Sequence, residues 1–328
     1  MEEKRLDVVA LGELLIDFTQ NGLSEQGNLL FEANPGGAPA NVLAMLRKLG
    51  RTCAFIGKVG RDSFGNLLEK VLIDTGIDVS CLRRDDVINT TLAVVHTFPN
   101  GDRDFSFYRK PGADMLLRPE ELDEDMLRRC RIFHFGTLSM TDEPCRSATR
   151  RALETAKKAG ALISFDPNLR APLWSDLDDA KDAIGWGLGQ CDILKIADNE
   201  LVFMTGTDDF DAGAEILRQK YPNIRLLNVT AGSEGSYSYC GGNRVFMPAC
   251  SLGGVIDTTG AGDTFCACIL NYVLENGLRD YSGEEMKEML SFANAAAYLV
   301  TTRKGAIRSM PDRECVEALL QDTLLERE

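Results

Sequence analysis

Short β-rich runs alternate with segments of helical spacing along most of this 328-residue chain, and this rhythm is what most restricts its fold. The first segments are "LDVVALGELLIDF", "APANVLAMLRKLG", "TCAFIGKVG" and "DSFGNLLEKVLIDTG"; the later β-rich runs are "IFHFGTL", "ALISFDPN", "DILKIADN" and "IRLLNVTAG". Such alternation predicts an α/β fold with a mainly parallel, doubly wound sheet and helices on both faces. Because no linker is evident, we expect one domain over residues 1–328, with ligands at the carboxyl ends of the strands.

The region 88–109 breaks this rhythm. Its sequence, "INTTLAVVHTFPNGDRDFSFYR", contains two strand-like runs joined by "PNGD", which is a hairpin signal, and no helical pattern separates them. We expect a small antiparallel sheet outside the main one, formed by residues 88–109 together with residues 18–33, that acts as a lid over a site. An edge hairpin of the main sheet fits the same pattern equally well.

The charge balance and the cysteine pattern exclude several classes of function. Lys and Arg total 36 against 50 Asp and Glu, so the net charge of −14 argues against an extended nucleic-acid surface. Glu13 and Asp17 interrupt the first apolar run, so we expect neither a signal peptide nor a membrane span, and a cytoplasmic location. Ten cysteines without a CxxC pair and only two histidines argue against a zinc site and against Ser-His-Asp or Cys-His hydrolases.

The stretch "DTTGAGDTF" at residues 257–265 is the strongest chemical signal. Gly260, Ala261 and Gly262 precede Asp263, and "TFCACILNYVLENG" then has helical spacing up to Gly277. Backbone N–H groups at a helix N-terminus form a cradle for phosphate, and an adjacent carboxylate can accept a proton from an attacking hydroxyl. The alternative is that Asp263 only caps the helix.

A second glycine-containing turn suits a polyol. "NPGGAPANVLAMLRKLG" places Gly36 and Gly37 before a helix that carries Asn41 in its first turn, and Asp17 ends the strand-like "LGELLID". No GxxxxGK[ST] occurs, and "GAGDTF" has Phe265 where a GxGxxG motif needs its third glycine. A dinucleotide-dependent oxidoreductase is therefore only a weak alternative.

Two segments, "PGGAPANVLAMLRKLG" and "DTTGAGDTFCACIL", resemble the signatures of the PfkB-type sugar kinases, the ribokinase family, in their order and separation. "AFIGKVGRDSFG", "RDFSFYRKPGADMLL", "FDPNLRAPLW", "VTAGSEG" and "TTRKGA" extend the resemblance over nearly the whole chain, and "GGAPAN", "FYRKPGADMLL" and "DPNLRAPLW" are most similar to fructokinases. The resemblance implies a ribokinase-like α/β fold with a β-sheet lid and an ATP-dependent sugar kinase, most similar to fructokinase. Alternatives are a 2-keto-3-deoxygluconate kinase, a ribokinase or another sugar or nucleoside kinase, and, from a different class, a non-catalytic sugar-binding regulatory protein.

The resemblance also implies site residues. Asp263 would be the catalytic base, with Gly260, Ala261 and Gly262 forming the anion hole. The residues that would bind the sugar are Asp17, Gly36, Gly37, Asn41, Arg109 and Arg170. The residues that would bind ATP are Lys195, Glu200, Thr230, Gly232, Gly235 and Asn294. Asp257, Thr259, Arg303 and Gly305 would surround a monovalent cation such as K⁺, and Glu200 would hold Mg²⁺ through water.

Two positions depart from the family pattern. Ala197 stands where the family's Asn-x-x-Glu segment has Asn, although Glu200 is present, and Gly112 stands where fructokinases commonly carry Ser. Arg109 and Arg170 could alternatively be ion-pairing residues in so acidic a chain. The partners implied are a small sugar and ATP, with no nucleic acid or membrane, and a homodimer formed through the lid.

Overall fold

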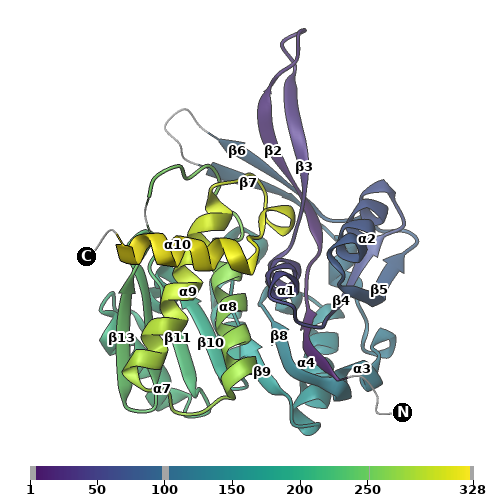
Figure 1. Cartoon of the computed structure of the whole chain (residues 1–328). Coiled ribbons are helices and arrows are strands. Elements are labelled where there is room, and N and C mark those ends of the chain that lie inside the picture. The colour runs from purple at the N-terminus through teal and green to yellow at the C-terminus, as the bar shows by residue number, and fades with distance from the viewer. Residues whose placement is uncertain (1–4, 98–102, 251, 326–328) are drawn as a thin grey trace.

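A nine-stranded sheet forms the centre of the molecule in the computed structural model, which describes residues 5–97, 103–250 and 252–325 (Figure 1). The strand order is β13-β12-β11-β10-β9-β8-β1-β4-β5. The strands are β1 (Leu6–Leu11), β4 (Cys53–Gly60), β5 (Asp78–Asp85), β8 (Cys130–Phe135), β9 (Leu162–Phe165), β10 (Ile193–Ala197), β11 (Leu226–Thr230), β12 (Gly235–Cys240) and β13 (Asn243–Pro248). In this spatial order, the strands from β11 to β5 are parallel to one another, and β12 and β13 add an antiparallel edge. The predicted mainly parallel sheet is therefore confirmed.

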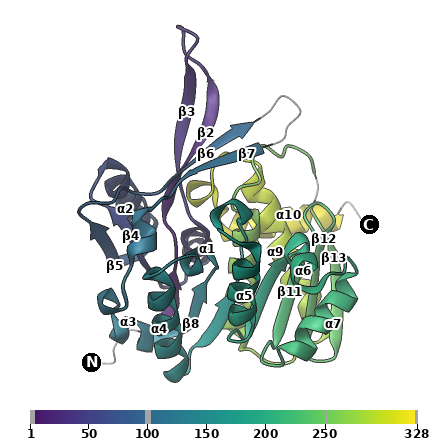
Figure 2. The ribbon, with the colours of Figure 1, turned by 180° about the vertical axis from the view of Figure 1, so that it is seen from behind.

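Helices cover both faces of this sheet, as the two opposite views show (Figures 1 and 2). One hydrophobic core lies under α1 (Ala38–Lys48), α2 (Ser63–Thr75), α8 (Ala261–Asn276), α9 (Gly283–Thr301) and α10 (Arg313–Leu325). The other lies under α3 (Glu124–Arg129), α4 (Cys145–Lys158), α5 (Leu177–Leu188), α6 (Asp198–Thr205) and α7 (Phe210–Lys220). Every residue of β4, "CAFIGKVG", is buried, as a strand covered on both faces requires.

A second sheet of four strands stands apart from the main one (Figure 1). Its order is β3-β2-β6-β7, with β2 (Leu15–Leu23), β3 (Leu29–Gly36), β6 (Leu92–Thr97) and β7 (Arg103–Tyr108). β2 is antiparallel to β3 and parallel to β6, and β6 is antiparallel to β7. The predicted small sheet is therefore confirmed, and the alternative of an edge hairpin is wrong. The sheet is mixed and not purely antiparallel as predicted, because β2 and β6 run parallel. The predicted "PNGD" turn, at 99–102, lies outside the described residues.

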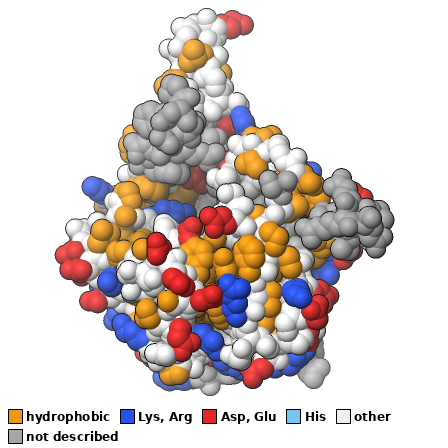
Figure 3. All heavy atoms as spheres, turned by 90° about the vertical axis from the view of Figure 1, so that its left-hand side faces the viewer, with side chains coloured by type: hydrophobic (Ala, Val, Ile, Leu, Met, Phe, Trp, Pro, Cys, Tyr) orange, Lys and Arg blue, Asp and Glu red, His pale blue; other side chains and the backbone are white. Residues whose placement is uncertain are grey.

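Hydrophobic side chains reach the surface near the antiparallel edge of the main sheet. Phe246 on β13 is exposed, as are Leu252, Val255 and Ile256 on the segment that leads from β13 to α8. The face seen in Figure 3 carries a broad group of hydrophobic side chains among charged ones.

Within the described ranges, none of the helices is both long enough and apolar enough to cross a membrane.

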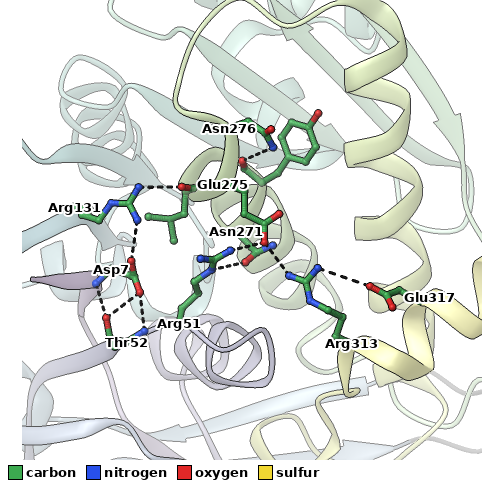
Figure 4. Close-up of polar contacts among 11 residues, drawn as sticks. Asp7, Arg51, Thr52, Arg131, Asn271, Glu275, Asn276, Arg313 and Glu317 are labelled. Atoms are coloured by element: carbon green, nitrogen blue, oxygen red, sulfur yellow. Dashed lines mark hydrogen bonds and ion pairs between the residues drawn. The ribbon is translucent and has the colours of Figure 1, made fainter.

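A polar network fixes the C-terminal end of α8 (Figure 4). Glu275 accepts hydrogen bonds from Arg51 and from Arg313, and the Arg131 guanidinium donates to the carbonyl oxygen of Leu274 at 2.9 Å. Cationic groups at this end complement the helix dipole. Because α8 is held at this end, the position of its N-terminal turn at the edge of the sheet is also fixed.

Candidate active site

The N-terminal turn of α8 is built from glycines that approach other atoms closely. Gly260 precedes the helix with φ of 80°, and a Cβ on it would lie 2.8 Å from the Ala306 Cβ. A Cβ on Gly262 would lie 3.0 Å from the Lys195 Nζ. Side chains are therefore disfavoured at both positions. Because α8 starts at Ala261, N–H groups of its first turn have no partner within the helix and can receive an anion.

Asp263 is an oriented carboxylate in this turn. Its Oδ2 accepts a hydrogen bond from the Asn41 Nδ2 at 2.8 Å, which brings the first helix of the chain against α8. Burial raises the pKa of Asp263 to about 6 and Asp166 adds to this, whereas Asn41, Lys195 and Arg170 lower it. Asp263 is thus mostly ionised at neutral pH. The Oδ1 of Asn41 is buried and finds no hydrogen-bond partner in the described part of the chain, so it is available to a ligand.

Lys195 places a cation beside the glycine turn. It lies on β10, is 7% exposed, and its Nζ is 3.1 Å from the Asp166 Oδ2. Burial opposes the charge on Lys195, but Asp166 and Glu200 together raise its pKa above the ordinary value. Glu200 accepts hydrogen bonds from the backbone N–H groups of Leu169 at 2.7 Å and Ala197 at 2.8 Å. It therefore ties the chain that follows β9 to the end of β10.

The turn at Gly36 and Gly37 lies against acidic residues. A Cβ on Gly36 would be 2.6 Å from the Asp17 Oδ2, and one on Gly37 would be 2.3 Å from the Glu13 carbonyl oxygen. Burial raises the pKa of Asp17 to about 7, and Asp263 contributes to this while Arg170 lowers it. These influences show that the small-sheet residue Asp17 and the α8 turn face the same site.

The predicted monovalent-cation residues lie around one loop. The Asp257 Oδ1 accepts from the Thr259 N–H at 3.0 Å and from its hydroxyl at 2.7 Å, and Oδ2 accepts from the Gly305 N–H at 3.0 Å. Arg303 follows at the end of α9, where its N–H donates to the carbonyl of residue 300. Asp257 therefore joins the segment before α8 to the segment after α9.

The predicted nucleotide residues lie next to β10. Thr230 ends β11 and pairs in register with Ala197 of β10. Gly232 and Gly235 follow with φ of 53° and 133°, and a Cβ on Gly235 would be 2.2 Å from the Met247 carbonyl oxygen. The β11–β12 turn thus needs both glycines and continues the edge on which Lys195 lies.

Asn294 supports this edge from α9. Its Nδ2 donates to the carbonyl oxygens of Met247 and Pro248, both at 3.1 Å, and its Oδ1 accepts from the Ser236 hydroxyl at 2.9 Å. A cavity of about 580 Å³ between α8, α9 and α10 is lined by Asn294 but, among the described residues, by neither Asp263 nor the glycine turns. We place the chemistry at the Asp263 site, because there Asp263 and Lys195 lie beside the backbone amides of the α8 turn.

The two predicted arginines have different positions. Arg170 is exposed, and it lowers the pKa of both Asp17 and Asp263, so its guanidinium lies toward the site. Arg109 is buried, and its nitrogens donate to Asp114 at 2.8 Å, to the Thr141 hydroxyl at 3.1 Å and to the carbonyl oxygen of residue 138 at 2.9 Å. These contacts favour a supporting role for Arg109 over the predicted contact with the sugar.

Sequence reasoning missed three site residues. Glu13 is 4% exposed and Asp166 is 2% exposed, and both lie at the ends of apolar strands, where a carboxylate is itself a signal. Asp114 has no such signal: it follows no apolar strand, and its partner Thr91 is 23 residues away in the sequence. Among the residues described, no three His, Cys, Asp or Glu side chains form a ready metal site.

A carboxylate base, a cradle of backbone amides and a buried cation form the parts needed to transfer a phosphoryl group to a hydroxyl. The fold and site thus define a phosphotransferase with an alcohol group as acceptor. The sequence pattern of the pfkB family of carbohydrate kinases matches residues 5–313, and the chain belongs to this family.

Named relatives agree with this class. The chain is 42% identical to "Probable fructokinase-2" of Arabidopsis thaliana over 93% of this chain and 92% of that protein. A fructokinase from Xylella fastidiosa with bound ATP superimposes with a TM-score of 0.87 at 30% identity, covering 97% and 99% of the two chains. A double-mutant fructokinase from Vibrio cholerae, with fructose, ADP and potassium bound, gives 0.84 at 28% identity over 97% and 100%.

Proposed function

We propose that this protein is an ATP-dependent fructokinase, which converts D-fructose and ATP to D-fructose 6-phosphate and ADP. The observation that carries the proposal is the Asp263 carboxylate, held by Asn41 at 2.8 Å within a glycine turn at a helix N-terminus. The similarity of the chain to proteins named fructokinase supports the choice of fructose as the sugar. A non-catalytic sugar-binding protein would not need this base and anion cradle together.

The mechanism follows from the placement of these groups. Asp263 accepts the proton of the attacking hydroxyl, while the first-turn amides of α8 bind the transferring phosphoryl group. Lys195, which lies against Gly262, offsets the negative charge that the β- and γ-phosphates bring. The glycine at position 262 lets this ammonium approach the phosphoryl position directly.

ATP requires a divalent metal, and two carboxylates suit it. The Asp166 Oδ2 lies outside hydrogen-bond geometry with Lys195 and is buried, so it can accept a water of a hydrated Mg²⁺. Glu200 keeps a lone pair on each oxygen besides the backbone hydrogen bonds that it accepts. The ion would neutralise charge on the phosphates. Because Glu200 also holds the Ala197 N–H, Ala197 shapes the site through its backbone.

The sugar half of the site suits a neutral ketose. Asp17 can accept from sugar hydroxyls, and Asn41 offers its unpartnered Oδ1. The absence of a side chain at Gly36 lets the backbone of this turn lie against the Asp17 carboxylate. A second candidate, 2-keto-3-deoxygluconate, carries a carboxylate, and the exposed Arg170 is the observation that favours it. Ribose is the third candidate.

A sugar panel tests the proposal. ADP release should be measured with fructose, 2-keto-3-deoxygluconate, ribose and glucose at saturating Mg-ATP. We expect fructose to have the highest kcat/KM and the product to be fructose 6-phosphate. Higher kcat/KM with another sugar would change the name of the substrate, and absence of phosphorylation of every sugar would remove the kinase assignment.

The small sheet also offers an apolar surface for a homodimer. Leu23, Leu29, Leu30 and Phe31 on β2 and β3 are all exposed. We propose that two copies pair through these strands. Light scattering after size-exclusion chromatography should give a dimer for the native chain and a monomer for Phe31→Asp, and a native monomer would contradict this.

A further inference from the structure

Three buried side chains, Thr91, Arg109 and Asp114, join β6 and β7 at the base of the small sheet. The Arg109 Nε donates to the Asp114 Oδ2 at 2.8 Å, and both side chains are 2% exposed. The Thr91 hydroxyl donates to the other oxygen of Asp114 through a short hydrogen bond. Because Thr91 directly precedes β6 and Arg109 directly follows β7, one carboxylate holds both strands where they leave the main body.

The same cluster is adjacent to the glycine turn on the sugar side. Glu13 accepts a hydrogen bond from the Ala38 N–H at 2.8 Å, so it caps α1 immediately after Gly36 and Gly37. Burial raises the pKa of Glu13 to about 7, with the charge of Asp114 adding to it and that of Arg109 lowering it. The Thr91 carbonyl oxygen also accepts a hydrogen bond from the Ile16 N–H of β2 at 3.2 Å, and the neighbouring Leu15 pairs with Gly36, so the cluster lies next to the turn.

The backbone at Gly112 leaves no space for a side chain. A Cβ on Gly112 would lie 1.8 Å from the Thr91 Oγ1 and 2.8 Å from the Asp114 Oδ1. The Thr91 hydroxyl fills this space, so the hydroxyl that faces Asp114 comes from the residue that directly precedes β6.

We infer that Thr91, Asp114 and Arg109 are positioning residues that set the small sheet against the sugar-binding turn, so that the sheet covers the reacting groups and excludes water. This inference rests on the proposed kinase function. Without that cover, water can replace the sugar: its oxygen bonds to the γ-phosphorus, the bond to the bridging oxygen breaks, ADP leaves and the proton passes to Asp263. ADP release would then exceed sugar phosphate formation.

Thr91→Val and Gly112→Ser test the inference without leaving Arg109 unpaired. Each should raise the KM for fructose about tenfold, because a displaced small sheet would weaken the charged hydrogen bond from Asp17 to the sugar. Each should also raise the ratio of ADP released to fructose 6-phosphate formed above one. In the double variant Gly112→Ser/Thr91→Ala, the loss of the Thr91 hydroxyl makes space for the new side chain, and the serine supplies a hydroxyl to the cluster. The ratio of ADP released to fructose 6-phosphate formed should therefore return toward one.

Thr90→Val is the matched control. Thr90 is adjacent to Thr91 and equally buried, and its hydroxyl donates to another carboxylate, Asp62, at 2.8 Å on the α2 side. This variant should lower Tm and leave the ratio at one. If Thr91→Val and Gly112→Ser also lower Tm only, with KM and ratio unchanged, the cluster is merely structural. The wild-type sugar panel tests kinase activity separately, so the two failures can be distinguished.

Discussion

The two halves of the candidate site differ in the sign of the charge that they present. On the main sheet, Lys195 and the first-turn amides of α8 converge, and both attract an anion. On the side of the small sheet, the Asp17 carboxylate lies against Gly36, and the Glu13 carboxylate accepts from the Ala38 N–H at 2.8 Å. Under the proposed function, the first half would bind the phosphates of ATP and the second half would bind the neutral sugar.

Asp263 lies where the two halves meet. Asn41 donates to it from the sugar half, and Lys195 lowers its pKa from the phosphate half. A base in this place can take a proton from the sugar while the phosphoryl group is held on the opposite side. The predictions below test this division, from the residue shared by both halves to the weakest contributor.

Asp263→Asn should have the largest effect. It can keep the hydrogen bond from Asn41 through its amide oxygen but removes the proton acceptor, so kcat should fall by about 10²–10⁴. The KM values for fructose and ATP should change little, because both binding halves remain. Initial rates and a thermal melt of the same preparation measure this. Near-normal turnover, or a lower Tm with unchanged activity of the folded fraction, would limit Asp263 to a structural role in the first turn of α8.

Lys195→Met should come next, and it acts on the phosphate half alone. Removing a cation that stabilises developing charge should lower kcat/KM for ATP roughly 10²-fold. Lys58→Met is the matched control, because Lys58 is also buried and its Nζ pairs with Glu121 at 2.8 Å, outside the site. Both variants leave carboxylates unpaired and should lower Tm, but only Lys195→Met should reduce the activity of the folded fraction.

A double variant separates charge from stability in the same half. Lys195→Met/Asp166→Asn removes both members of the buried pair, so it should regain much of the Tm lost in Lys195→Met. Activity should remain low, because the cation is still absent. Recovery of activity together with Tm would show that Lys195 acts only by neutralising Asp166.

The difference between the halves also explains what the sequence could predict. The α8 turn is contiguous, so the glycines and helical spacing of "DTTGAGDTF" were enough to predict its structure. Thr91 meets Asp114 across 23 residues of the chain, a contact that periodicity does not reveal. The contact of Arg109 with the sugar was implied by the family resemblance and stays a prediction, although its nitrogens donate to Asp114, Thr141 and residue 138.

Asp17→Ala tests the sugar half. A sugar hydroxyl would lose a charged partner worth about 1.5–3 kcal/mol, which raises the KM for fructose roughly 10- to 150-fold. The KM for ATP should not change, because Asp17 belongs to the small sheet. Equal increases in both KM values would mean that the substitution disturbs the whole site and that the two halves are not independent.

Stability and activity should respond to pH in opposite directions. Burial raises the pKa of Asp17 and Glu13 to about 7 and that of Asp263 to about 6. Between pH 4 and 7 these three carboxyl groups hold protons in the folded state that they release in the unfolded state. Burial lowers the pKa of His134 to about 4, which acts in the opposite direction, but one imidazole opposes three carboxyl groups, so the free energy of unfolding decreases as pH rises through this window. Ionisation of Asp263 should meanwhile raise kcat/KM about tenfold per unit up to pH 6.

Chemical unfolding and initial rates across this pH range check both trends. Asp17→Asn removes one of the raised carboxyl groups, so the decrease in stability with pH should become smaller while the acid limb of kcat remains. A free energy of unfolding that increases from pH 4 to 7 would show that these carboxylates are better stabilised in the folded state than their burial implies.

The smallest effect is expected from monovalent cations at Asp257. This carboxylate holds both the Thr259 segment and the Gly305 segment, and those segments flank the α8 turn of the phosphate half. A bound K⁺ would offset its charge near the phosphates, so kcat should be a few-fold higher in KCl than in NaCl or tetramethylammonium chloride at equal ionic strength. The KM for fructose should change less than kcat, although Lys304 of this loop donates to Asn21 of the small sheet at 2.9 Å. Asp257→Asn should abolish the response to K⁺. Identical rates in all three salts would mean that Asp257 joins two loops without a cation, and that Lys195 and Mg²⁺ supply the positive charge of the phosphate half.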